Sequence, residues 1–256
     1  MLLITEQLDL HGLTLLAQGR ILALQVRRFI QPTHAQALAG QILGGGYQHY
    51  LNAPSIGRIG MAFYETEGQP QRMTEYFQQA GDHISELRRR CLPFASPIDV
   101  LRCALDERWP AGAHLQTLFG CKMFVGLSRV VEPSVQFLAH HDIFAKDAPE
   151  TLAALSLHQQ FAANIYLAMP EQGGELQLWQ QEMAAELFDQ MRGESYGIDP
   201  ALLGEPTVEL QPAAGDLVLF NSRKMHAVAS SQQRSRLSLS CFVGYRGYHQ
   251  PLTFWS

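Results

Sequence analysis

The chain has 256 residues, 46% of them hydrophobic and 17% charged, and a formal net charge of −5 at pH 7. This balance is typical of a folded globular protein and excludes a disordered chain. The absence of a basic excess argues against a nucleic-acid partner, and the length predicts one domain spanning residues 1–256.

The N-terminal part, about residues 1–115, predicts helices preceded by one early strand at residues 21–26. Three stretches combine apolar side chains at helical spacing with suitable start or stop residues: 33–43, which ends at three glycines, 71–92, which ends at Pro93, and 96–109, which begins at Ser96–Pro97. The only dense basic run, Arg88–Arg90, ends the second of these helices, where cations are favoured by the helix dipole.

The second part, about residues 120–245, predicts a β core with the N-terminal helices packed on its outside. Apolar or alternating runs separated by turn residues indicate strands at 122–131, 137–143, 164–169, 176–179, 215–228 (two strands joined by a short loop) and 236–243. Residues 183–191 predict a short helix inserted before the last strands, in a position to serve as a lid.

Two imidazoles and one carboxylate in this core are spaced as metal ligands. Alternate side chains of an extended strand share a face, so His140 and Asp142 can reach one metal while His141 points away. His226, from a different predicted strand, completes the set. Such a set leaves three coordination positions open, as in non-haem Fe(II) oxygenases. The chemistry indicated is therefore oxidative.

The His-x-Asp pair alone is a weak signal, because ten histidines and 24 acidic residues in 256 predict about one such match by chance. Its context strengthens it, since Arg236 and Ser238 follow His226 on an alternating strand. A guanidinium pairs bidentately with a carboxylate and keeps its proton. Arg236 can therefore hold the far end of a carboxylate cosubstrate, and Ser238 can add a hydroxyl donor.

With these residues the chain resembles the 2-oxoglutarate/Fe(II)-dependent dioxygenase superfamily. The resemblance covers about residues 120–245 and rests on four segments: HxD at His140 and Asp142, Asn164–Leu167 with Gly173–Leu176, GDLVLF…HAV with His226, and RLSLS with Arg236 and Ser238. It implies a mostly β fold with flanking helices, a double-stranded β-helix (a cupin-like jelly roll) with iron near one open end. The N-terminal half matches no motif.

The resemblance also implies that Fe(II), 2-oxoglutarate and O2 are required. In this superfamily the decarboxylation of 2-oxoglutarate to succinate and CO2 is coupled to oxidation, usually hydroxylation, of a second substrate. We expect a small molecule here, such as an amino acid or its derivative. Relatives that halogenate carry Gly or Ala in place of Asp142, so hydroxylation or desaturation is favoured. Asn164 and Tyr166 share a strand face and are expected to line the cosubstrate pocket, with an ordinary barrel contact as the alternative.

Four further residues are candidates for substrate binding. Arg58 lies in a segment whose glycines permit close approach, where it can anchor a carboxylate while Phe63 contacts an apolar portion; the alternative is an ordinary loop arginine. Arg129 faces the core interior only if the strand parity is favourable. Lys146 follows Asp142 closely, and its alternative is a plain surface position.

Two other classes of function stay open. One is a metal-dependent, non-redox isomerase or lyase of the cupin type, which would leave Arg236 and Ser238 without a task. The other is a non-catalytic barrel that serves as a binding module, which would not need an intact ligand set. Metal analysis of protein purified without oxygen separates these classes from an oxygenase.

Cysteine usage and hydropathy predict a cytoplasmic protein without a membrane partner. The four cysteines form no CxxC pair, which indicates reduced thiols. The apolar residues 1–4 are followed at once by polar residues, so no signal peptide is expected, and no window approaches the length of a membrane span. The oligomeric state is left open by the sequence.

Overall fold

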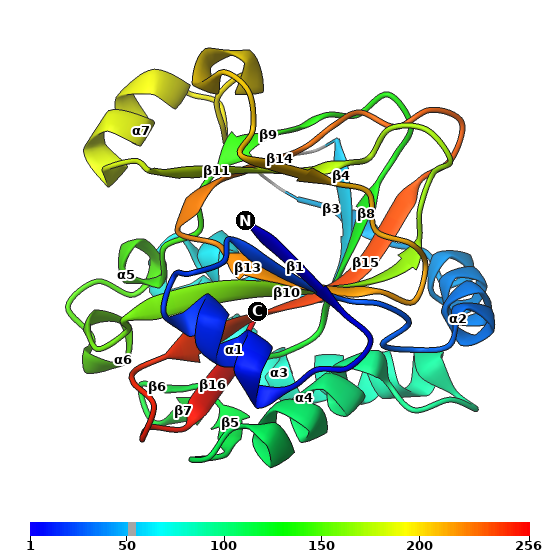
Figure 1. Cartoon of the computed structure of the whole chain (residues 1–256). Helices are drawn as coiled ribbons and strands as arrows, with labels where there is room; N and C mark the ends of the chain where they lie inside the picture. The colour runs from blue at the N-terminus through cyan, green and yellow to red at the C-terminus, as the bar shows by residue number, and fades with distance from the viewer. Residues whose placement is uncertain (51–54) are drawn as a thin grey trace.

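The computed structural model describes residues 1–50 and 55–256, which form a large and a smaller β sheet (Figure 1). The strands of the major sheet are β1 (Leu2–Thr5), β2 (Ala23–Val26), β3 (Gln48–His49), β4 (Ile56–Ile59), β5 (Ala113–Leu115), β8 (Leu127–Val131), β10 (Gln159–Ala168), β13 (Leu217–Asn221), β15 (Arg236–Tyr245) and β16 (Leu252–Trp255). Those of the minor sheet are β9 (Phe137–His140), β11 (Leu176–Glu182), β12 (Val208–Leu210) and β14 (Lys224–Val228). A separate hairpin consists of β6 (Thr117–Leu118) and β7 (Cys121–Lys122).

The strand order brings distant parts of the chain together. The major sheet runs β1-β2-β13-β10-β15-β8-β4-β3, with β16 beside β15 and β5 beside β16. The minor sheet runs β12-β11-β14-β9. The two sheets do not join into one closed barrel, and the predicted mostly β class with flanking helices is confirmed.

The helices lie outside the sheets. They are α1 (Leu10–Ala17), α2 (Pro32–Gly44), α3 (Pro70–Cys91), α4 (Pro97–Arg108), α5 (Phe144–Asp147), α6 (Leu152–Leu155), α7 (Ala185–Arg192) and the 3-10 turns η1 (Phe63–Thr66) and η2 (Pro200–Leu203). The three predicted N-terminal helices are confirmed as α2, α3 and α4, each of which begins with a proline in its first turn. Within the described residues, no helix combines the length and apolarity that crossing a bilayer requires.

Helices cover one face of the major sheet, and the other face points toward the minor sheet. Helices α2 and α4 contribute Leu38 and Leu105 to a core shared with Ile165 of β10 and Leu239 of β15. Figure 1 shows α3 and α4 below this sheet and the minor sheet above it. Burial of these apolar side chains is the main force that holds the N-terminal helices on the sheet.

The alternation of β10 and β15 places polar side chains inside the protein. In β15, Leu237 and Leu239 join the core under the helices, whereas Arg236 and Ser238 line a pocket on the opposite face. Asn164 of β10 lines the same pocket. All five side chains are buried. The polar face of these strands therefore faces the space between the sheets and not the solvent, which makes it available for binding.

Two predicted strands of the core are shorter than expected. The stretch 122–131 is divided between β7 and β8, because Gly126 has a φ of 111° and a Cβ atom there would lie 2.6 Å from Leu87. The stretch 137–143 ends at His140, where β9 stops. The other predicted elements overlap with observed ones: 164–169 with β10, 176–179 with β11, 215–228 with β13 and β14, 236–243 with β15, and 183–191 with α7.

Candidate metal and substrate site

Three side chains of the HxD segment and β14 converge at the edge of the minor sheet. Strands β9 and β14 are antiparallel, and His140 lies opposite His226 in their register. Asp142 lies beyond the end of β9, where its backbone N–H donates to the Ser222 carbonyl oxygen at 2.8 Å. The strand predicted for residues 137–143 therefore ends before Asp142. Residues 141–143 belong to no helix or strand, and the hydrogen bond to Ser222 ties them to the β13–β14 connection.

The donor atoms of His140, Asp142 and His226 all lie within 4.8 Å of one another. Each histidine uses Nδ1 as a donor to a backbone carbonyl, at 2.8 Å to Leu138 and at 2.9 Å to Lys224. The Nε2 atoms therefore carry lone pairs, as metal-ligating imidazoles do when their other nitrogen is anchored in this way.

The contact between His226 and Asp142 shows that a cation fits this site. Nε2 of His226 lies 3.3 Å from Oδ2 of Asp142. Because Nδ1 holds the ring proton, this contact joins two lone-pair atoms and is not a hydrogen bond. Oδ2 is buried and has no hydrogen-bond donor among the described residues. An ion between these atoms would relieve their repulsion, and two nitrogens with one carboxylate oxygen suit Fe(II).

Burial and neighbouring charges keep this set in its metal-binding protonation state. Burial, with His226 nearby, lowers the pKa of His140 to about 3, so the imidazole is neutral near pH 7. Burial alone would raise the pKa of Asp142, but the pKa stays below its ordinary value, and the positive charge of the Arg129 guanidinium contributes to this lowering. The carboxylate is therefore ionised.

A second group of residues lines a pocket next to the histidines. Arg236 donates from Nη2 to the Tyr166 hydroxyl at 3.2 Å, and its guanidinium lies 5.0 Å from the centre of the Tyr166 ring. Its Nε is buried without a partner in the described structure, as is Oδ1 of Asn164. Ser238 lies opposite Tyr166 in the β10–β15 register. The pocket thus offers unused donors from a fixed guanidinium beside the candidate metal site.

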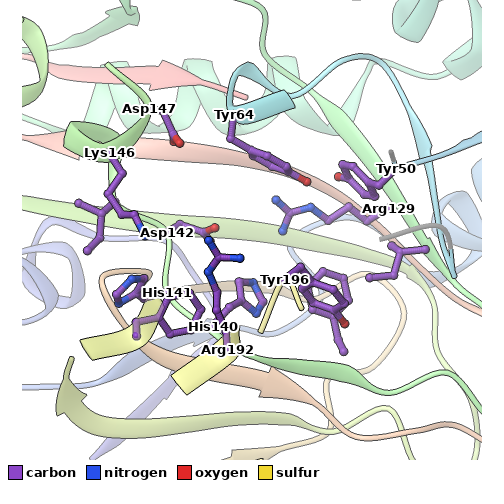
Figure 2. A pocket seen from close by; sticks show the side chains of 14 residues that line it. Tyr50, Tyr64, Arg129, His140, His141, Asp142, Lys146, Asp147, Arg192 and Tyr196 are labelled. Carbon is purple, nitrogen blue, oxygen red and sulfur yellow. The ribbon is translucent and has the colours of Figure 1, made fainter. Parts of the chain in front are cut away.

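A larger pocket opens on the other side of the ligand set, with a cavity volume of about 240 Å³ (Figure 2). Its wall includes the predicted residues His140, Asp142, Arg129 and Lys146. Sequence reasoning missed the polar side chains that complete it: Tyr50, Tyr64, His141, Asp147, Arg192 and Tyr196. They come from the N-terminal part, from the HxD segment itself and α5 after it, and from the region around α7. Outside the HxD segment, no motif was available to find them.

Arg129 lies between the two pockets. It occupies the position opposite Ser238 in the β8–β15 register, and it lines both cavities. Its Nε has no hydrogen-bond partner within residues 1–50 and 55–256. The strand parity is therefore the favourable one, and this guanidinium faces the candidate site.

Lys146 is held at the wall of the larger pocket by α7. Its ammonium group lies 3.1 Å from Oδ1 of Asp189 and 5.4 Å from the centre of the Phe188 ring. Arg192 donates from Nε to the same aspartate at 2.8 Å. The helix α7, which was predicted as a lid, thus contacts Lys146 of α5 through one ion pair and one aromatic ring.

His141 lines the larger pocket although it is not part of the ligand set. Its ring lies against Phe188, with 4.4 Å between the ring centres, and neither ring nitrogen has a partner in the described part of the chain. Burial, followed by the nearby Lys146, lowers its pKa to about 4. It therefore presents a neutral imidazole to this cavity.

Arg58 and Phe63, which were predicted to bind substrate, line neither of these two pockets. Arg58 is paired with Glu65 at 2.8 Å, with side chains only 12% and 2% exposed. Phe63 is buried in the core against Tyr76 and Phe144. Both residues are held by the fold, because η1 directs Phe63 inward and places Glu65 beside the guanidinium.

Replacing Arg58 by methionine is therefore expected to destabilise the protein. The change leaves Glu65 buried without its cation, a loss of about 3 kcal/mol for a buried pair. Urea denaturation should show this, while Arg72→Met, which removes the more exposed contact to Glu67, should cost about 1 kcal/mol or less. If the Arg58→Met variant were fully stable and bound substrate more weakly, Arg58 would have to act in substrate binding and not in stabilising the fold.

Comparisons with known proteins agree with this geometry. The family model of the 2OG-Fe(II) oxygenase superfamily matches residues 125–244, the stretch that carries both histidines, Asp142, Arg236 and Ser238. A curated relative, the L-gamma-glutamyl-L-propargylglycine hydroxylase of Streptantibioticus cattleyicolor, is 31% identical over 162 residues. The aligned stretch spans 62% of this chain and 59% of that relative's length.

Solved structures share the fold over nearly the whole chain. An N-substituted L-amino acid dioxygenase from Burkholderia ambifaria superimposes with a TM-score of 0.64 at 16% identity, covering 96% of this chain and 91% of the other. HygX from Streptomyces hygroscopicus, solved with nickel and 2-oxoglutarate, gives a TM-score of 0.52 at 15% identity, covering 93% and 87%. These similarities support the predicted double-stranded β-helix.

Proposed function

We propose that the chain is a 2-oxoglutarate/Fe(II) oxygenase, which uses Fe(II), 2-oxoglutarate and O2 to hydroxylate an amino acid or an amino acid derivative; the family match over residues 125–244 and the similar hydroxylase support this. The observation that carries the proposal is the meeting of His140, Asp142 and His226, whose donor atoms converge with lone pairs unused. Arg236 lies beside this set with an unused guanidinium N–H.

Each group at the site has a task in this reaction. Iron held by His140, Asp142 and His226 would supply the oxidation, in which O2 and 2-oxoglutarate are converted to succinate, CO2 and the oxygen atom of the product hydroxyl. Arg236 binds the C5 carboxylate of 2-oxoglutarate by charge-assisted hydrogen bonds, and Ser238 adds a hydroxyl donor.

Two residues of β10 orient the cosubstrate. Tyr166 holds the Arg236 guanidinium through its hydroxyl and its ring, so that fewer side-chain rotamers are lost when the carboxylate binds. Asn164 lines the same pocket with an unpartnered amide oxygen among the described residues. These contacts keep the cosubstrate in one orientation relative to the metal ligands.

The second substrate occupies the larger pocket. The curated relative is a hydroxylase of a γ-glutamyl amino acid, and we propose that this chain acts on an amino acid or a derivative such as a γ-glutamyl dipeptide. Arg129 offers an N–H without a protein partner in residues 1–50 and 55–256, which suits a substrate carboxylate. Lys146, which is paired with Asp189, lies at the same wall as a further polar contact for the substrate.

A reducing compartment would suit this function, since Fe(II) must be protected from oxidation. The four cysteines are free thiols in the structure, which is typical of such compartments. We therefore propose a cytoplasmic location. Fractionation of the source cells tests it, and recovery of the protein from an oxidising compartment would contradict it.

The expected product carries one added oxygen and no halogen. Asp142 supplies a carboxylate where a halide would otherwise bind, so hydroxylation is expected even at high chloride. The test is mass spectrometry after anaerobic loading with iron and 2-oxoglutarate, followed by O2 and candidate amino acids and γ-glutamyl dipeptides. A gain of about 16 mass units supports hydroxylation, by simple arithmetic on the reaction. A chlorinated product would show that Asp142 does not occupy that position.

A further inference from the structure

The charged side chains of the larger pocket differ in whether the protein already neutralises them. Lys146 and Arg192 both pair with Asp189 of α7, at 3.1 and 2.8 Å. Asp142 belongs to the metal-ligand set. Asp147 is the remaining carboxyl group on the wall, and within the described residues its side chain forms no hydrogen bond or direct ion pair.

Asp147 is placed by α5, the short helix that follows the HxD segment. Asp147 lines the larger pocket together with Tyr64 and Asp142, and in Figure 2 it is drawn above Asp142. Its chain neighbour Lys146 does not neutralise it, because the Lys146 ammonium group turns to Asp189. Burial, together with the negative charge of Asp142, raises the pKa of Asp147 to about 8. Lys146 acts in the opposite direction, but among the described residues no cation pairs directly with this carboxyl group.

Asp147 is half-buried at the pocket wall. Ionising a carboxyl group there without a partner is unfavourable, and a cationic ligand removes this penalty. A second metal ion is not indicated, since the described residues contain only one cluster of potential metal ligands, and Asp147 is outside it. An organic ammonium group needs only one carboxylate and accepts the mixed polar and aromatic wall formed by Tyr50 and Tyr64. The pocket also holds Arg129, whose free N–H suits a carboxylate.

We infer that Asp147 binds a free ammonium group of the substrate and so selects amino acids and derivatives that keep this group. The inference rests on the proposed function, because it concerns the second substrate of that reaction. It adds a specificity-determining residue that the HxD and RLSLS segments do not include. The substrate class becomes a zwitterion, with its ammonium at Asp147 and its carboxylate at Arg129.

The first experiment needs no variant. L-Amino acids and γ-L-glutamyl dipeptides are compared with analogues in which a hydroxyl group replaces the free ammonium group, so that size is nearly unchanged and charge is removed. Hydroxylated product is measured by mass spectrometry, and kcat/KM is determined for the best pair. The free-ammonium member should be favoured at least tenfold. Equal turnover of the two members would overturn the inference.

The second experiment compares Asp147→Asn with the matched control Glu186→Gln, which removes one negative charge from an exposed position in the first turn of α7. In Asp147→Asn the preference for the ammonium member should fall to within about threefold, mainly through KM. The neutral amide of asparagine forms hydrogen bonds of similar strength with an ammonium group and with a hydroxyl group. The control should keep the wild-type preference. An unchanged preference in Asp147→Asn would overturn the assignment.

Thermal denaturation separates this role from a structural one. Folding raises the pKa of the Asp147 carboxyl group to about 8. The free energy of unfolding therefore falls as the pH rises from the ordinary pKa of an aspartate toward 8. Asparagine has no such penalty, so Asp147→Asn should melt at the same or a higher temperature at pH 8. A marked fall in melting temperature would show that the carboxylate supports the fold and would count against the inference.

Failure of the inference is distinguishable from failure of the proposed function. Anaerobic calorimetry of the iron-loaded wild-type protein measures 2-oxoglutarate binding without any second substrate. Absence of this binding would contradict the proposed function. Normal 2-oxoglutarate binding, together with no hydroxylation of any free-ammonium compound in the panel, would overturn the assignment of Asp147 alone.

Discussion

Replacing His226 by alanine is expected to abolish both iron retention and succinate formation. The imidazole is one of three converging ligands, and the side chain is buried where no other described residue replaces it. Loss of an outer partner of a metal ligand already costs 10–100-fold in affinity or activity, so loss of a ligand itself should exceed about a hundredfold. Iron content after anaerobic loading and succinate formation with 2-oxoglutarate measure the two effects.

The neighbouring histidine provides a matched control for iron retention. His141 is buried within the same segment but lies outside the ligand set, so His141→Ala should keep its iron. Equal iron loss in both variants would show that the ligand set is assigned wrongly. Unchanged turnover of the wild-type protein after complete removal of iron would contradict the oxygenase function itself.

Replacing Arg236 by alanine is expected to weaken 2-oxoglutarate binding severely while iron is retained. The variant leaves the C5 carboxylate without its cation in a buried pocket, a loss of roughly 2–5 kcal/mol, which corresponds to a factor of about 30 or more. Titration of 2-oxoglutarate into anaerobic, iron-loaded protein measures this loss directly.

Arg234 is a suitable control because it is two residues away and its side chain is 72% exposed. Arg234→Ala should bind 2-oxoglutarate as the wild type does. If Arg236→Ala kept its affinity, the carboxylate would have to bind elsewhere, and Arg129, which lines the same pocket, would be the next guanidinium to test.

The residues proposed for metal and cosubstrate binding were predictable because they lie in recognisable strand segments. Side-chain direction alternates along a strand, so Arg236 and Ser238 had to share a face once β15 was recognised. The opposition of His140 and His226 follows from the pairing of β9 with β14. Asp142 was predicted to join the histidines by strand alternation; the structure brings it close to them, although β9 ends before it.

The pocket proposed for the second substrate was mostly beyond prediction. Its wall combines Tyr50, Arg129, Asp147 and Tyr196, which lie in four separate parts of the sequence. Arg58 was chosen for its local setting, but a buried partner, Glu65, engages it instead. Sequence spacing shows which way a strand residue points relative to its neighbours, not which loops meet at the rim of a sheet. That the whole chain forms one domain stays a prediction.

The sequence by itself determined which chemistry to propose: the HxD pair, the distal histidine and the RLSLS strand indicate a metal, a carboxylate cosubstrate and a β core. These features are local, because each depends on residue type and on the two-residue period of a strand. Only the tertiary structure decided which charges are left without partners. Lys146 and Arg192 are neutralised by α7, whereas Asp147 and Arg129 face the cavity. Neutralisation depends on contacts between distant segments, and these arise only when the sheets and helices pack.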